Sequence, residues 1–144
     1  MQTINPMVRF FLNLSKTHSV LANRFDRGLG GLGFSEFLIL FSLDQAKDGK
    51  MRRVDLAEKI GMTASGVTRL LLPMEKVHLI ESGPTESDAR ARLVEATPAG
   101  KEKLKEALER LEVLAEDFIP SNKAKDVVKA SELLLEIGGR AVML

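Results

Sequence analysis

The segment RVDLAEKIGMTASGVTRL, residues 53–70, decides the fold of this chain. It predicts two short helices, residues 53–61 and 63–77, joined by a tight turn. Ala57 is small enough to let the two helices cross closely, and Gly61 can adopt the positive φ that the turn requires. The Thr63 hydroxyl can cap the second helix. With apolar positions facing inward at Leu56, Ile60, Val67 and Leu70, this pattern predicts a helix-turn-helix.

The second of these helices is predicted to expose a small, polar face that carries one cation, formed by Thr63, Ala64, Ser65, Thr68 and Arg69. Such a face can approach a DNA major groove and bond to phosphates and base edges. Gly66 lies in the same helix, where glycine costs up to about 1 kcal/mol relative to alanine. Something that approaches closely at this point would account for it. An ordinary helical hairpin with polar residues facing solvent is the alternative interpretation.

The residues after the helix-turn-helix predict a β-hairpin, with strands at 80–84 and 90–96 and a tip at 83–89. A hairpin in this position is a wing. Arg90 and Arg92 are two residues apart and share a face of a strand. A cation near a hairpin tip can reach a minor groove or a phosphate, and Asp88 can orient one of these arginines through a charge-assisted bond.

Helices are also predicted at residues 4–27, 34–46, 98–118 and 124–142, with a glycine-rich turn at 28–33 and a loosening of the last helix at 138–139. For the helix at 98–118, Thr97 suits the N-cap and Pro98 suits the first helical position, and Pro120 ends the helix. We therefore predict a mostly α-helical fold. Its winged helix-turn-helix lobe, residues 34–97, carries a small β-hairpin. Helices in residues 4–33 and 98–144 form a dimerisation region, and the whole is a single domain.

Composition excludes several kinds of function. The chain has 144 residues, a net charge of only +1 and no cysteine, so disulfides, thiol switches and cysteine-ligated zinc are excluded. Its two histidines, His18 and His78, lie far apart without metal-ligand spacing. Neither a nucleophile elbow nor a phosphate-binding loop is present. We expect no enzyme activity, metal or cofactor. With no signal-peptide pattern and no membrane-length apolar run, we expect a cytoplasmic location.

The chain closely resembles the MarR family of bacterial transcriptional regulators. The family's wing pattern is matched at Asp88, Arg90, Thr97, Pro98 and Gly100, and its helix-turn-helix pattern at residues 56–61 and 67–70. The resemblance implies a homodimer that binds double-stranded DNA at a pseudo-palindromic operator. It places Ser65, Thr68 and Arg69 in the major groove and Arg90 in the minor groove. Blocking a promoter, as a repressor, is the simpler mechanism.

Three positions depart from the family pattern. Many members have glycine where this chain has His78, although histidine tolerates the left-handed conformation better than most residues. Pro73 removes a backbone donor near the end of the recognition helix and is expected to kink or loosen its last turn. Glu81 and Ser82 stand where members often carry arginine. These departures predict weaker DNA binding, and they motivate an alternative function, a helical dimeric adaptor with a vestigial DNA-binding lobe.

The two ends of the chain are more apolar than a monomer of this size needs. Leu104, Leu108, Leu111, Ala115 and Phe118 form a heptad-like seam, and apolar residues crowd the last helix. A two-fold dimer would cover them and place two recognition helices about 34 Å apart. The resemblance further implies a small aromatic or phenolic effector, with a pocket lined by residues 34–46 and the first helix. Such an apolar stripe is also typical of plain core.

Overall fold

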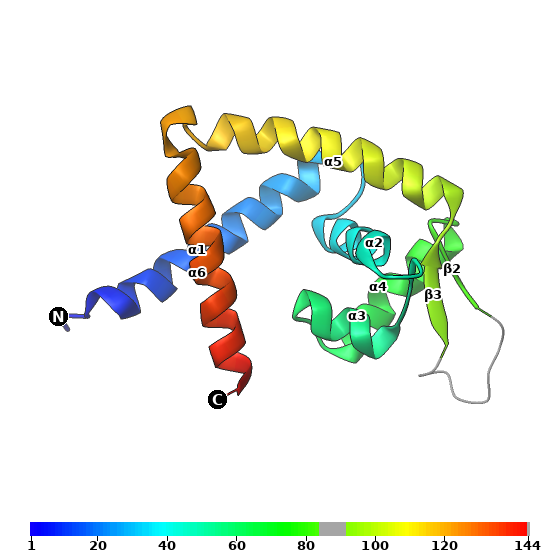
Figure 1. Cartoon of the computed structure of the whole chain (residues 1–144), viewed down its shortest axis with the longest axis horizontal. Coiled ribbons are helices and arrows are strands. Elements are labelled where there is room, and N and C mark those ends of the chain that lie inside the picture. The colour runs from blue at the N-terminus through cyan, green and yellow to red at the C-terminus, as the bar shows by residue number, and fades with distance from the viewer. Residues whose placement is uncertain (84–91, 144) are drawn as a thin grey trace. The chain divides into compact units, whose positions relative to one another are not determined.

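The computed structural model of this protein describes residues 1–83 and 92–143 (Figure 1). The chain forms two compact units, Met1–Leu111 and Glu112–Leu144. In the described residues the elements are, in order, α1 (Pro6–Gly28), α2 (Phe34–Gln45), β1 (Lys50–Arg52), α3 (Arg53–Ile60), α4 (Ala64–Lys76), β2 (Ile80–Ser82), β3 (Leu93–Ala96), α5 (Pro98–Phe118), the 3-10 turn η2 (Ser121–Lys123) and α6 (Ala124–Met143). The predicted mostly helical fold is confirmed.

The glycine-rich turn between α1 and α2 is held by side chains on both sides. Asp26 in α1 accepts a hydrogen bond from the backbone N–H of Phe34 at 2.7 Å. Glu36 in α2 accepts one from the N–H of Gly33 at 2.9 Å. These two bonds satisfy N–H groups that the start of α2 would otherwise leave free. Lys103 in α5 donates to the carbonyl of Gly30 at 2.8 Å and ties the turn to a third helix.

A three-stranded antiparallel sheet has the order β1-β3-β2. β3 pairs with β1 through Met51 opposite Val94 and with β2 through Ile80 opposite Ala96. The pairing of β2 with β3 confirms the predicted wing, although β2 ends at Ser82 and β3 begins at Leu93. The sequence analysis missed β1, because three residues are too few to show strand alternation and only pairing with β3 makes them a strand.

The core of the first unit lies where α2, α3, α4 and the sheet meet. Its fully buried side chains include Ile39, Leu40, Leu43, Leu56, Val67, Met74, Ile80 and Val94. α2 is apolar nearly all round, as expected for a helix with neighbours on several sides. This core holds the helix-turn-helix rigidly against the wing.

The start of α5 locks the sheet to the helical part of the first unit. Thr97 caps α5 by accepting a hydrogen bond from the N–H of Gly100 at 3.0 Å, and Pro98 occupies the first helical position, both as predicted. A Cβ on Gly100 would overlap the backbone carbonyl of Leu79. Only glycine therefore allows α5 to approach the chain leaving α4 so closely.

In the second unit, α6 runs without a break through Gly138 and Gly139, and none of its described residues is buried. The predicted loosening at this glycine pair does not interrupt the helix. Its exposed apolar residues include Val127, Val128, Leu133, Leu134, Leu135, Val142 and Met143.

Candidate nucleic-acid interface

The turn between α3 and α4 has the predicted geometry. Gly61 adopts φ 71°, and the N–H groups of Gly61 and Met62 bond to the carbonyls of Glu58 and Ala57. These two hydrogen bonds form a Schellman motif, which satisfies the last carbonyls of α3. Ala57 is only 5% exposed at the crossing of the two helices. Leu56 and Val67 are buried as predicted, whereas Ile60 and Leu70 are half-buried.

The N-terminus of α4 is built by Thr63. Its hydroxyl accepts a hydrogen bond from the N–H of Gly66 at 3.0 Å and lies 3.3 Å from the hydroxyl of Ser65. A Cβ on Gly66 would stand 3.0 Å from Thr63 Oγ1 and 3.3 Å from Met62 Cε. A side chain on Gly66 would therefore crowd the hydroxyl that caps the helix. Thr63, Ala64 and Ser65 are all exposed, as predicted.

Further along α4, Arg69 is exposed but Thr68 is half-buried. The Thr68 hydroxyl donates to the carbonyl of Ala64 at 3.1 Å and accepts from Nη1 of Arg53, also at 3.1 Å. Arg53 is the first residue of α3, and the sequence analysis did not single it out. No motif marks it, because the bond joins residues 15 positions apart on two helices.

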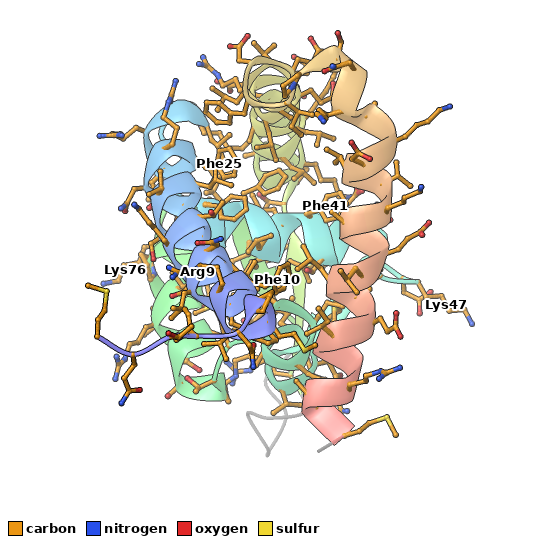
Figure 2. All side chains as sticks on the ribbon, turned by 90° about the vertical axis from the view of Figure 1, so that its left-hand side faces the viewer. Arg9, Phe10, Phe25, Phe41, Lys47 and Lys76 are labelled. Atoms are coloured by element: carbon orange, nitrogen blue, oxygen red, sulfur yellow. The ribbon has the colours of Figure 1, made fainter. Side chains whose placement is uncertain are left out.

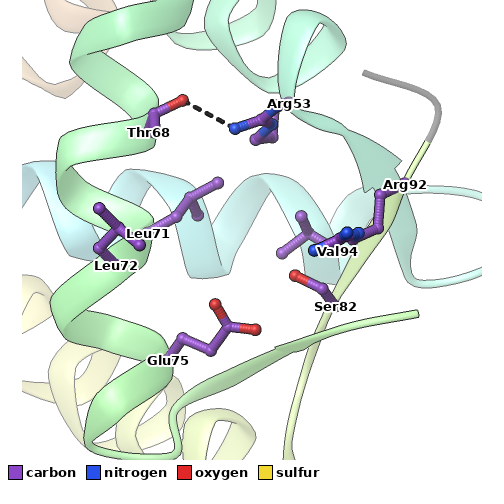
Figure 3. Close-up of a pocket in the computed structure, with 8 residues that line it drawn as sticks. All are labelled: Arg53, Thr68, Leu71, Leu72, Glu75, Ser82, Arg92 and Val94. Carbon is purple, nitrogen blue, oxygen red and sulfur yellow. Dashed lines mark hydrogen bonds between the residues drawn. The ribbon is translucent and has the colours of Figure 1, made fainter. Parts of the chain in front are cut away.

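A cavity of about 110 Å³ separates α4 from the base of the wing (Figure 3). Arg53 and Thr68 line it from the helix-turn-helix, and Ser82 and Arg92 line it from the wing. Nε of Arg92 is buried and has no hydrogen-bond partner within residues 1–83 and 92–143. The structure thus places Arg92 at the inner base of the wing. Asp88 and Arg90, the other two wing residues proposed from the sequence, lie outside the described residues.

The C-terminal end of α4 repeats the cap of α3 with a different residue. His78 adopts φ 60°, and the N–H groups of His78 and Leu79 bond to the carbonyls of Glu75 and Met74. Histidine thus takes the left-handed position, as predicted. α4 continues past Pro73 to Lys76, with Val77 bonding back to the Pro73 carbonyl. The last turn of α4 therefore still forms after the proline.

A second, more open hollow of about 440 Å³ is lined by four cations, Lys47, Lys50, Arg52 and Lys59. Two of them have acidic partners. Arg52 bonds to Asp55 at 2.8 Å, and Lys50 lies 3.8 Å from Glu95. The hydrogen bond from Arg52 holds the pKa of the Asp55 carboxyl below its usual value. Because the four side chains are 35–52% exposed, the pairs contribute little to stability.

Four phenylalanines of the first unit form a row. Ring centroids are 5.0 Å apart for Phe25 and Phe34, and 6.0 Å apart for Phe34–Phe37 and for Phe37–Phe41. Figure 2 shows the two ends of the row, with Phe25 on α1 and Phe41 on α2. Phe37 is buried, and Phe41 is exposed. The row joins α1 to α2, the two helices expected to line an effector pocket.

Within the described ranges, no group of three or more histidine, aspartate or glutamate side chains is placed to hold a metal ion. No helix in the described part of the chain is both long and apolar enough to cross a bilayer.

Solved structures with this arrangement of elements are transcriptional regulators. BldR from Sulfolobus solfataricus is 23% identical, with a TM-score of 0.75 over 94% of this chain and 99% of that one. Sco5413, a MarR-family regulator from Streptomyces coelicolor, is 16% identical, with a TM-score of 0.79 over 94% and 96%. The chain has the MarR fold. Sco3205, another MarR-family regulator from Streptomyces coelicolor, was solved in complex with DNA and is 17% identical, with a TM-score of 0.72 over 94% and 90%.

The MarR fold covers nearly the whole chain in each of these pairs. No family model and no curated protein matches the sequence itself. The likeness therefore concerns the fold.

Proposed function

We propose that this protein is a MarR-type transcriptional regulator that binds double-stranded DNA and has no catalytic activity. The observation that carries the proposal is the exposed N-terminal face of α4. Thr63, Ser65 and Arg69 project from a helix that a buried core and a Schellman turn hold in place. Small polar side chains and one cation suit the major groove. Sco3205, which has the same fold, was solved in complex with DNA, and this supports the proposal that the chain binds DNA.

We further propose that the protein acts as a homodimer on a pseudo-palindromic operator. Neither α1 nor α6 has a buried residue among those described. In proteins most of the stability of a helix comes from packing of its apolar face, so both helices need a partner surface. Exposed apolar residues on α1, such as Met7, Phe11 and Leu12, and those on α6 would be covered by a second copy of the chain. In this proposal residues 4–33 and 98–144 form the dimerisation region, and residues 34–97 form the DNA-binding lobe.

We also propose that the protein represses transcription by blocking a promoter. A small aromatic or phenolic effector would release it from the DNA. The exposed ring of Phe41, at the end of the aromatic row, supports an apolar effector. A regulator of this kind acts where the DNA is, in the cytoplasm.

The testing experiment is a fluorescence anisotropy titration with labelled DNA from upstream of the protein's own gene. Wild type, Arg69→Ala and Arg90→Ala are compared at low and moderate salt, with scrambled DNA as competitor. We expect binding that weakens with salt, because counterions are released, and that survives the competitor. Both variants should bind more weakly.

A different result would favour the adaptor function. Glu81, exposed on β2 at the start of the wing, adds a negative charge beside the proposed DNA surface. If wild type binds neither this DNA nor any duplex selected from a random pool, the DNA-binding proposal fails and the dimeric adaptor takes its place.

A further inference from the structure

We propose that Thr68 reads a thymine through its methyl group, and that Arg53 is the positioning residue that turns this methyl toward the DNA. The inference rests on the proposed function, since it names the chemistry that α4 would recognise.

The Thr68 hydroxyl is already engaged on the inner side of α4. Its single hydrogen is donated to the carbonyl of Ala64, one turn earlier in the same helix. One of its two lone pairs accepts from the guanidinium of Arg53. A hydroxyl has one hydrogen to give. Thr68 therefore cannot donate to a phosphate or a base acceptor without breaking its bond to Ala64.

Two bonds to fixed partners also select the rotamer of Thr68. The side chain of a β-branched residue occupies staggered positions, and a hydroxyl held toward Arg53 and Ala64 leaves the methyl group in another of them. Figure 3 shows the hydroxyl of Thr68 turned toward Arg53 across the cavity. Thr68 is half-buried, so part of the side chain remains open to a partner. The hydroxyl hydrogen is not available to a base acceptor, whereas the methyl group makes no hydrogen bond and can contact a base.

Thymine is the base that such a group recognises. In the major groove it alone carries a C5-methyl, and threonine methyl groups make apolar contacts with it. Burying one methyl-sized group changes affinity by about fourfold. Arg53 contributes to specificity by holding the Thr68 hydroxyl.

The test uses the full-length protein and a duplex selected from a random pool. Each thymine in the selected site is replaced in turn by uracil, which differs only in lacking the methyl group. We expect one position in each half-site at which the wild type binds the uracil duplex about fourfold more weakly. Thr68→Ser, which keeps the hydroxyl and loses the methyl, should bind both duplexes equally. Thr3→Ser, the same change at an exposed threonine before α1, is the matched control and should discriminate as the wild type does.

The role of Arg53 is tested by the same ratio of affinities. Arg53→Ala should lower the thymine-to-uracil ratio toward one, and Arg53→Lys, which can still donate, should restore part of it. Arg52→Ala removes an adjacent charge that pairs with Asp55 and should leave the ratio unchanged. Thermal unfolding of each variant checks that the fold is retained, and Thr68→Ser and Arg53→Lys suffice if Arg53→Ala does not fold.

Three results would overturn the inference. One is a selected site in which no thymine-to-uracil replacement matters. Another is an Arg53→Ala variant that weakens binding to both duplexes equally and lowers the salt slope by about one, which would make Arg53 a phosphate contact. The third is a wild type that selects no duplex at all. Only this last result also removes the proposed function, so the two failures are distinguishable.

Discussion

Thr97 and His78, 19 positions apart, are joined by a 2.6 Å hydrogen bond from the threonine hydroxyl to the histidine carbonyl. The same hydroxyl accepts from the N–H of Gly100 and so caps α5. A backbone bond from Thr97 to the carbonyl of Leu79 lies beside it. One side chain thus ties the end of the recognition helix to the start of α5.

The first prediction concerns this side chain. Thr97→Val keeps the shape but loses both hydrogen bonds, and it should lower the free energy of unfolding by about 1–2 kcal/mol, the usual effect of losing a cap. Thr97→Ser keeps the hydroxyl and should stay close to wild type. Urea denaturation of the three proteins measures the difference. Equal stability of the Thr97→Val variant and the wild type would contradict a structural role for the bond.

A larger loss is expected at Gly100. Because a Cβ there would overlap the Leu79 carbonyl, Gly100→Ala must push the backbone of α5 away from the chain after α4. Forced shifts of this kind cost roughly 1–3 kcal/mol or more. Ala99→Ser, at the exposed neighbouring position, is the control and should stay within about 0.5 kcal/mol of wild type. Thermal unfolding that shows no difference between the two variants would argue against this close approach.

The left-handed conformation of His78 predicts an unusual gain in stability. His78→Gly relieves the strain at φ 60°, and we expect an increase in unfolding free energy of up to about 1 kcal/mol. His78→Val, with a β-branched side chain at the same φ, should be destabilised instead. Urea denaturation checks this prediction: the midpoint should be highest for the His78→Gly variant, lower for the wild type and lowest for the His78→Val variant. Any other order would show that the cap is not what limits stability here.

Arg69 is the exposed cation on the face of α4 proposed to enter the groove. Replacing one base-contacting arginine typically costs about 1–3 kcal/mol of binding free energy. We therefore expect Arg69→Ala to weaken binding to a selected duplex by about tenfold or more. Lys105→Ala removes an exposed charge from α5 and serves as the control, with affinity near that of wild type. Matching affinities for the two variants would move the DNA surface away from α4.

The exposed apolar residues of α6 predict a dimer that a single charge can break. Leu134→Asp should shift the protein from dimer to monomer in analytical ultracentrifugation, since an aspartate would lose its hydration in an apolar interface. Lys129→Asp introduces the same side chain at a polar position of the helix and should remain dimeric. A wild type that sediments as a monomer at every concentration would end the dimer proposal.

Local sequence patterns were enough to predict the helix-turn-helix and its caps. As caps, Gly61, Thr63 and Thr97 act within a few residues of their own position, through backbone conformation and bonds to nearby N–H groups. Such local effects can be predicted from a single sequence. The exposed face of α4 followed from helical spacing for the same reason, and only Thr68 is less exposed than that spacing implied.

Other features depend on contacts between distant parts of the chain. β1 is a strand only because β3 lies beside it. The bond from Arg53 to Thr68 and the inward position of Arg92 both required the tertiary structure. The sequence by itself determined which helices form and where they turn, because those depend on neighbouring residues. Tertiary structure decided which polar groups on them are already engaged, because hydrogen bonds join residues that only folding brings together.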